Sequence, residues 1–383
     1  MDTLPKGNMS NGHKQYPPTG RIASIDALRG FAMFWIAGGG MVFIALAGVW
    51  PNALTEMLGR QMGHARWDEA FHLEDLIMPL FIFVVGLVLP WSVRRRVERR
   101  ESRRTLYLHI VSRAIGLFVI GIVIQNYRHP FSLSEMHWPG VLQRIAVCYL
   151  LAAILVIHTR WRTQAVVMGA ILLFGWAAMT LVPVPGYAAG DLTPQGCLPA
   201  YVDQQLLPGR FHREYYGHGD SNGIVPTLMS VATAILGSLA GCWLRTDRSG
   251  DSKALGLAIG GIVCLCAGLA WGVVFPVIRL IWTSSMVLYA GGYSLLLLAF
   301  FYWMIDVKML RKWAFFFIVI GMNSIVIFVL PNFVNFSALP VFLLRGVIHH
   351  CPSLEPLMVA VGTMAAEWLL LWCLFRCQIF IRV

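Results

Sequence analysis

The sequence is poor in charged residues, and this shortage excludes an ordinary soluble domain. Only 13% of its 383 residues are Asp, Glu, Lys or Arg, whereas 57% are hydrophobic and the mean hydropathy is +0.66. Soluble domains carry about 25% charged residues. A chain of this length with so few polar side chains cannot cover a water-exposed surface, so the composition indicates a protein of the lipid bilayer.

The sequence also lacks any cysteine or histidine spacing that is typical of a metal site. The Cys264-Leu-Cys266 pair has no further ligand residues around it, so we expect no metal. Cys197 and Cys351 are the cysteines that fall in loops on the external side. A disulfide between them is one alternative, but the sequence gives no geometry that would decide it.

Apolar runs recur along the chain, and each is long enough to cross a membrane. About 20 apolar residues span the ~30 Å hydrocarbon layer as a helix. These runs predict an all-α polytopic membrane protein with ten transmembrane helices, preceded by a disordered polar tail at residues 1–20. The predicted helices lie at approximately residues 25–48, 73–93, 105–125, 139–158, 164–184, 225–244, 254–275, 283–305, 313–331 and 354–375.

Positive charge gathers on alternate loops. The net charge of +11 would suggest nucleic acid as the partner of a soluble protein, but most of the 30 Lys and Arg residues fall on one side of the predicted membrane helices. The positive-inside rule therefore places both termini in the cytoplasm. The run "RRRVERRESRR" at 94–104 then anchors the topology against anionic lipid. The loop at 185–224, which is rich in glycine, aromatic residues and histidine, is external.

Polar side chains within apolar segments are costly, and they mark candidate binding sites. Arg113 lies about 12 Å into its predicted helix, where it needs a buried partner or an anionic ligand. Gln143 and Arg144 lie near the outer end of the fourth segment. Asn323 and Ser324 lie within the ninth, either joining helices or contacting a ligand. Intramembrane residues of this kind also suit a secondary transporter, although the two halves of the chain show no internal repeat.

A titratable cluster stands just before the second segment, in "GHARWDEAFHLEDLIMPLFIF". A histidine titrates near neutrality and can act as a general base, which makes His64 a candidate catalytic residue. Asp75 either orients this imidazole or caps the following helix. Trp67 either stacks on a sugar or belongs to the aromatic belt at the membrane surface. His72 is read as an interfacial histidine, and Glu74 as a weaker candidate than Asp75.

Three motifs carry a resemblance to a known family. They are "SIDALRGFAMFWI", the spacing His64-x2-Trp67-x7-Asp75-Leu-x2-Pro, and the loop Cys197-x3-Tyr201-x-Asp203. In this order, and along essentially the whole chain from Arg21, the sequence resembles the membrane acyltransferases related to heparan-α-glucosaminide N-acetyltransferase. It departs from them in "GGG" at 38–40, where the family has an asparagine-bearing stretch, and in "VLPNFVNF", where the lysosomal enzyme has Gly-His-Glu.

The resemblance implies a single transmembrane acyltransferase domain over residues 21–383, forming a compact helix bundle and a homodimer. It implies acetyl-CoA as the acyl donor and an amino sugar or glycan hydroxyl on the external face as the acceptor. The two departures favour a glycan other than heparan and a bacterial relative in the inner membrane. Whether the product is an amide or an ester, and whether His64 is acetylated on the way, stays open.

The residues then fall into three predicted groups. His64 matches the family's catalytic histidine, with Asp75 beside it. The donor is assigned to the polar intramembrane groups, which are Arg113, Gln143, Arg144, Asn323 and Ser324. The acceptor is assigned to Trp67, Tyr201 and Asp203.

Overall fold

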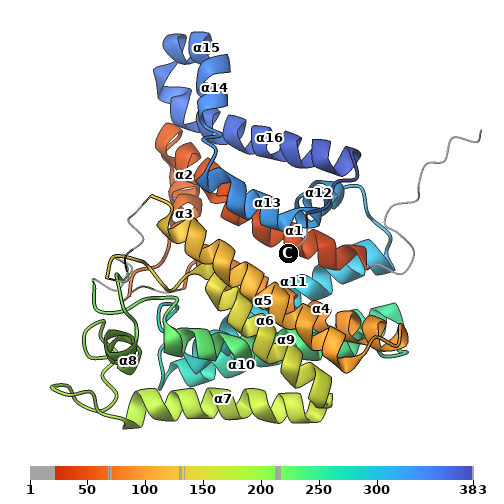
Figure 1. Ribbon diagram of the computed structural model, residues 1–383. Coiled ribbons are helices and arrows are strands. Elements are labelled where there is room, and N and C mark those ends of the chain that lie inside the picture. Colours follow the sequence, from red (N-terminus) through yellow and green to blue (C-terminus); the bar gives the residue numbers. More distant parts are fainter. Residues whose placement is uncertain are drawn as a thin grey trace, which may run out of the picture.

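The computed structural model describes residues 22–67, 69, 71–128, 132, 134–211 and 217–381. Within these ranges every regular element is a helix and none is a strand. Figure 1 shows the long helices running in broadly similar directions through the molecule, with α7 and α16 near its opposite edges. The predicted disordered tail at 1–20 lies outside the described residues.

The α-helices are α1 (Ala23–Phe34), α2 (Gly40–Val49), α3 (Ala53–Gln61), α4 (Ile77–Glu98), α5 (Arg103–Asn126), α6 (Val141–His158), α7 (Trp161–Leu181), α8 (Leu198–Leu206), α9 (Ile224–Leu244), α10 (Gly250–Gly272), α11 (Ser284–Tyr302), α12 (Phe315–Met322), α13 (Ser324–Val329), α14 (Ala338–Leu343), α15 (Arg345–His350) and α16 (Glu355–Arg376). Shorter helical turns are η1 (Trp35–Gly39), η2 (Glu74–Leu76), η4 (Trp303–Val307), η5 (Leu330–Asn332) and η6 (Pro352–Leu354).

Nine helices among the described residues are long and apolar enough to span a membrane. They correspond to nine of the ten segments predicted from composition, with ends that differ by several residues. The protein is therefore an integral membrane protein of the polytopic all-α class. The remaining predicted segment is formed by α12 together with α13 and η5, which bend by 76° at their junction and make either a broken span or a re-entrant loop.

That bend corrects one prediction, because the segment 313–331 was expected to be a single helix. It breaks at Asn323, whose backbone takes the non-helical angles φ −125° and ψ 41°. The Asn323 side chain donates from Nδ2 to the carbonyl of Ile379 and accepts at Oδ1 from the amide of Ile381. These two hydrogen bonds to the backbone of the C-terminal segment stabilise the break. The hydropathy of residues 313–331 could not predict it, because the partners lie more than 50 residues away in the sequence.

Close helix contacts at glycine hold the centre of the bundle together. A Cβ atom on Gly86 of α4 would lie 1.8 Å from the carbonyl oxygen of Ala234 in α9, and one on Gly237 would lie 2.0 Å from the carbonyl oxygen of Phe83. Small residues let membrane helices approach until their backbones touch. The pairs α4–α9, α10–α11 and α1–α12 make the most extensive contacts, so this packing fixes where the ends of α4 and α9 lie.

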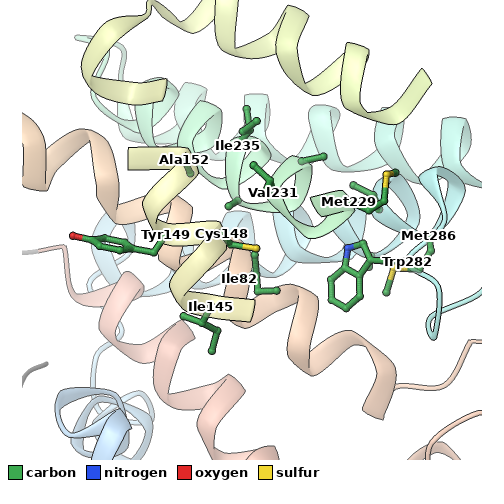
Figure 2. Close-up of a cluster of buried hydrophobic side chains, with 14 of the residues drawn as sticks. Ile82, Ile145, Cys148, Tyr149, Ala152, Met229, Val231, Ile235, Trp282 and Met286 are labelled. Atoms are coloured by element: carbon green, nitrogen blue, oxygen red, sulfur yellow. The ribbon is translucent and has the colours of Figure 1, made fainter. Parts of the chain in front are cut away.

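A buried apolar cluster fills the space between α4, α6, α9 and the start of α11 (Figure 2). Its members include Ile82, Ile145, Cys148, Val231 and Trp282. The ring of Trp282 is fully buried, and Figure 2 shows it and the ring of Tyr149 on opposite sides of the cluster. Dense interiors of this kind hold side chains in fixed positions, which allows polar groups at the cluster's edges to be placed accurately.

The first span is interrupted between α1 and α2. The π-helical turn η1 contains Gly38, whose φ of +106° lies in the region that favours glycine. Such turns inside α-helices are frequently found at functional sites. Gly40 follows directly, and a Cβ atom there would lie 3.3 Å from Cβ of Met62 and 3.7 Å from Oε2 of Glu74. The interruption therefore faces the loop that carries His64.

The glycine contact between α4 and α9 gives the first prediction. Gly86→Ala places a methyl group against backbone that cannot move aside, so we expect it to lower the free energy of unfolding by roughly 1 to 3 kcal/mol. Thermal unfolding in detergent measures this. Gly169→Ala in α7 is the control, because a Cβ there meets nothing within 4 Å. Equal melting temperatures for the two variants would contradict the packing.

Candidate active site

The carboxylate of Asp75 contacts several parts of the chain just before the start of α4. Asp75 is 1% exposed and belongs to η2. Its Oδ2 accepts hydrogen bonds from the backbone amides of Ala65 at 3.3 Å and His72 at 3.0 Å. Its Oδ1 lies 2.7 Å from Nε of Arg279. Asp75 therefore faces a histidine and holds the preceding loop by its amides, but it does not cap the following helix, because neither η2 nor α4 has a side-chain cap.

That histidine is His64, whose Nδ1 lies 3.4 Å from Oδ1 of Asp75. The distance is longer than an ordinary hydrogen bond, as is common for catalytic contacts in unliganded enzymes. The His64 side chain is 51% exposed, so a substrate can approach it. Because Nδ1 faces the carboxylate, Nε2 is the ring nitrogen left for chemistry, and Asp75 is placed to orient the imidazole.

Trp67 lies in the loop after His64, and its side chain connects this loop to the long loop at 185–224. Its Nε1 donates to the carbonyl of Leu192 at 2.8 Å, and its ring packs against the apolar cluster. A small pocket opens here, lined by residues 65–67, 69, 71, 75 and 277–280. The pocket places apolar surface, carboxylates and guanidinium groups side by side within reach of the Asp75 carboxylate.

His72 makes contacts within the loop that carries His64, so it is not simply an interfacial histidine. Its Nδ1 lies 2.9 Å from the carbonyl oxygen of Gly63, and its backbone amide is bound by Asp75. The imidazole therefore supports the loop that carries His64.

A second polar network anchors the loop at 185–224 to the start of α9. Asp203 of α8 is fully buried and accepts from the amides of Ile224 at 2.9 Å and Asp220 at 3.1 Å. Burial raises the pKa of Asp203 to about 6, although these two amides and the nearby Arg144 oppose the shift. Tyr201 lies on the same helix and is half-buried. Both residues of the Cys-x3-Tyr-x-Asp motif are thus brought to one place, where Asp203 caps α9.

His137 extends this network and was missed in the sequence. Its Nε2 lies 2.6 Å from Oδ2 of Asp220, and its backbone amide donates to Oδ1 of Asn126 at 2.7 Å. Its only sequence signal is a histidine next to a tryptophan in "SEMHWPG". The pair fastens the loop before α6 to the loop before α9, across a large separation in sequence.

Arg144 lies between the two networks. It is 3% exposed, and its guanidinium carbon stands 4.4 Å from the ring centroid of Trp282. Trp282 has a positive φ of 54° and donates from Nε1 to Oγ1 of Thr233. A positive φ in a bulky residue is strained and is kept where the surroundings enforce it. The same short loop, residues 276–283, therefore presents Arg279 to Asp75 and Trp282 to Arg144.

Gln143 lies beside Arg144 at the outer end of α6. Its Nε2 donates to the carbonyl of Trp138 at 3.2 Å, and its buried Oε1 has no hydrogen-bond partner among the described residues. An unmatched buried acceptor is uncommon and calls for a donor. A ligand with a hydrogen-bond donor could therefore bind to Oε1 of Gln143.

Arg113 occupies a separate position, toward the opposite end of the bundle. Its guanidinium carbon lies 4.8 Å from the ring centroid of Tyr149, and its Nε is buried without a hydrogen-bond partner among the described residues. A second small pocket lies beside it between α4, α5 and α6, lined in part by Ser92, Arg96, His109 and Tyr149. Asn323 and Ser324 lie at neither position, because Asn323 is bound to the C-terminal segment.

The cysteines take no part in these networks. Cys197 and Cys351 are both free, and Cys197 is fully buried while Cys351 is exposed, so the disulfide alternative is wrong. Burial raises the pKa of the Cys197 thiol to about 12, which leaves it unreactive near neutrality. Among the described residues no group of three or more His, Cys, Asp or Glu is placed to hold a metal ion.

Comparison with known proteins shows what this chain is similar to. A family model described as the catalytic part of heparan-alpha-glucosaminide N-acetyltransferase matches residues 21–197, which include His64, Asp75, Arg113 and Arg144. Heparan-alpha-glucosaminide N-acetyltransferase of Homo sapiens is 27% identical over 373 residues, covering 82% of this chain and 52% of the human protein. The Mus musculus protein of the same name is 26% identical over 369 residues, covering 81% and 53%.

The chain is thus similar to heparan-α-glucosaminide N-acetyltransferase over most of its length. It spans about half the length of the curated relatives it matches. This similarity agrees with the resemblance seen in the motifs around His64. The family model ends at residue 197, so Tyr201, Asp203 and Arg279 lie beyond the matched region.

The Asp203 network gives the second prediction. Asp203→Ala removes the acceptor of two backbone amides at the start of α9, and unmatched buried donors cost roughly 1 to 3 kcal/mol each. We expect a lower melting temperature and faster protease cleavage of the external loop. Gln204→Ala is the matched control, because this neighbour makes one exposed hydrogen bond to the carbonyl of His218. Equal cleavage rates in the two variants would show that Asp203 does not hold the loop.

Proposed function

We propose that the protein is a transmembrane acyltransferase that moves an acetyl group from cytosolic acetyl-CoA to an amino sugar or glycan hydroxyl on the external face. The observation that carries this proposal is the triad of His64, Asp75 and Arg279 at one mouth of the bundle, in a chain related to heparan-α-glucosaminide N-acetyltransferase. An exposed imidazole beside a buried, charge-balanced carboxylate is the arrangement that general-base catalysis requires.

His64 would act as the base in the transfer step. A protonated amine or a hydroxyl is a poor nucleophile, and it must lose a proton as it attacks the thioester carbonyl. Nε2 of His64 takes that proton, and the imidazolium then returns a proton to the departing thiolate. Asp75 stabilises the imidazolium through Nδ1, while the guanidinium of Arg279 lies against the same carboxylate. Attack by His64 itself, giving an acetyl-imidazole, uses the same geometry.

The donor would enter from the opposite side. Coenzyme A carries phosphates, and the pocket beside Arg96, His109 and Arg113 presents positive charge between α4, α5 and α6. Guanidinium groups bind phosphate strongly through charge-assisted hydrogen bonds. Arg144 and Gln143, which lie nearer the outer mouth, would contact the pantetheine and thioester end. Asn323 and Ser324 have a weaker case, because the Asn323 amide already binds backbone.

The orientation follows from charge. The distribution of Lys and Arg supports cytoplasmic termini and an external loop at 185–224, which puts His64 on the external face and the Arg113 pocket toward the cytoplasm. We further propose a single transmembrane domain over residues 21–383, a location in the bacterial inner membrane, and a homodimer. Trp67, Tyr201 and Asp203 would border the acceptor, with Asp203 acting through the loop that it anchors.

A secondary transporter of a polar or anionic solute is the alternative, and the broken span at α12–α13 favours it, because broken helices form transporter sites. A transporter would move acetyl-CoA or the acceptor without forming acetylated product. Transfer of labelled acetyl groups in proteoliposomes therefore separates the two functions.

The third prediction is that His64→Ala abolishes transfer while leaving the fold intact. Loss of a positioned general base typically costs about 10²- to 10⁴-fold in rate. The measurement uses oriented proteoliposomes, with labelled acetyl-CoA on the cytoplasmic side and a glucosamine-terminated acceptor on the other. His72→Ala loses only its ring contact with Gly63, so it should retain activity within about tenfold. If His64→Ala transferred acetyl groups at a rate within a few-fold of the parent, another residue would have to be the general base.

The fourth prediction concerns the donor pocket. Arg113→Ala should reduce the thermal stabilisation that coenzyme A gives, because it removes a cation that stacks on Tyr149 at the edge of the pocket. Arg128→Ala is the matched control, since Arg128 follows the outer end of α5 and also stacks on a tyrosine ring, at 5.0 Å from the centroid of Tyr127. If coenzyme A stabilised both variants as much as the parent, Arg113 would be a structural residue.

A further inference from the structure

Glu367 is a buried carboxyl group that neither polar network uses. It lies near the middle of α16 and is 4% exposed, and its Oε2 has no hydrogen-bond partner among the described residues. At 1.5 Å per residue it stands roughly 18 Å from the start of the helix and roughly 14 Å from its end. Over those distances the side chain cannot reach polar surroundings at either end, so it has to be accommodated where it lies.

The helices around Glu367 supply no counter-charge. The elements that pack most closely against α16 are η1, α2, α12, α14 and η6, and none of these five contains an Asp, Glu, His, Lys, Arg, Cys or Tyr residue. On α16 itself the other titratable residues are Glu355, Cys373 and Arg376, all of them exposed. No charged group in the described part of the chain acts on the Glu367 carboxyl. A carboxyl group buried without a cation is accommodated as the neutral acid, which keeps its proton.

A second unmatched polar atom lies one helical turn away. Oγ1 of Thr363 is buried and has no hydrogen-bond partner within the described ranges, and residues four apart on a helix are neighbours. A carboxylic acid has both an O–H donor and a carbonyl acceptor, whereas a carboxylate only accepts. Rotation about the side-chain bonds can therefore join the acid to the Thr363 hydroxyl without any counter-charge. A proton is also a ligand that needs no cavity.

The carboxyl group faces the bundle at a place where the first span is interrupted. Glu367 shares a helix face with Leu371 and Phe375, which belong to the buried core. On the bundle side, η1 contains Gly38 at a φ of +106° and contacts both α13 and α16. Irregular backbone at membrane depth is tolerated only where protein or water covers it. α16 is therefore part of the cover over η1, and water would have to replace it if α16 moved away.

We propose that Glu367 is a proton-binding site that fastens α16 onto the interrupted first span. The carboxyl group keeps its proton while α16 packs against η1 and α2. When α16 separates from them, the O–H bond breaks, the proton passes to water, and water solvates the carboxylate. The bound ligand is the proton, so this proposal does not depend on acetyl transfer.

The first span connects this proton site to the loop that carries His64. Its second half, α2, starts at Gly40, whose Cβ position lies 3.3 Å from Cβ of Met62 at the end of α3. Because α2 packs against both α16 and α3, a movement of α16 reaches Met62 and the loop that follows it. Release of the proton from Glu367 therefore loosens the support of that loop.

Infrared spectroscopy of the purified protein tests whether the proton is bound. At neutral pH the parent should show a carboxylic-acid C=O band that is lost in Glu367→Gln, because this variant has no carboxyl group at that position. Glu355→Gln is the matched control and should keep the band, since Glu355 is an exposed carboxylate in the first turn of the same helix. An identical band in the parent and in Glu367→Gln would overturn proton binding.

Hydrogen exchange tests the link between the proton and the position of α16. The amides of η1 and α16 are compared between the parent and Glu367→Gln at each pH, so that the intrinsic pH dependence of exchange cancels. An opening that releases one proton should become up to about tenfold more frequent per pH unit in the parent. It should stay constant in Glu367→Gln, which has no proton to release. Equal acceleration in the two proteins would overturn the coupling.

The parent alone provides a further test that does not require the variant to fold. Its infrared band must disappear only at a pH at which the amides of η1 and α16 have lost their protection from exchange. A band that disappeared while these amides stayed protected would show that Glu367 ionises without any movement of α16, which would overturn the proposal.

Discussion

The burial of one carboxylate organises the end of the helix bundle at which α4 begins. Burying a carboxylate such as that of Asp75 costs several kcal/mol unless cations and hydrogen-bond donors surround it. Its partners come from two parts of the chain, namely the loop that carries His64, Ala65 and His72 and the loop that carries Arg279. Arg279 can reach Asp75 only if residues 276–283 fold tightly, and the strained Trp282 lies in that loop. The guanidinium of Arg144 stacks on the ring of Trp282. The loop that brings Arg279 to Asp75 therefore also fixes the position of Arg144.

The glycine-mediated packing of α4 against α9 explains why the two polar networks lie at the same end. Asp75 stands at the start of α4, and Asp203 caps the start of α9. Since the two helix backbones touch at Gly86 and Gly237, neither start can shift along its axis without moving the other. The helix dipoles then direct partial positive charge toward the same region. A thioester oxygen that gains negative charge during attack would be stabilised there, which an apolar mouth could not provide.

Composition and periodicity were enough to predict the class of fold and nine of the spans, because the hydrocarbon layer dictates length and hydropathy directly. The site was only partly predictable. His64 and Asp75 are close in sequence, so their spacing made their meeting foreseeable, whereas Arg279 was indistinguishable from any other loop arginine until the fold brought it to Asp75. The break at Asn323 escaped prediction for a similar reason, since it depends on the backbone of residues 379–381. The pairing of Cys197 could not be read from the sequence either, since only the fold shows that its side chain is fully buried at the start of α8 while Cys351 is exposed and both are free.

The neighbouring acids Glu74 and Asp75 belong to one turn but face different parts of the molecule. Successive residues of a 3₁₀ turn point about 120° apart, so η2 directs Asp75 inward to Arg279 and Glu74 toward the interrupted first span. Asp75 is held by two backbone amides and lies against Arg279, and such fixed surroundings suit the orientation of the His64 imidazole. The sequence "FHLED" does not distinguish the two acids, because only the fold brings Arg279 to Asp75 and leaves Glu74 against Gly40.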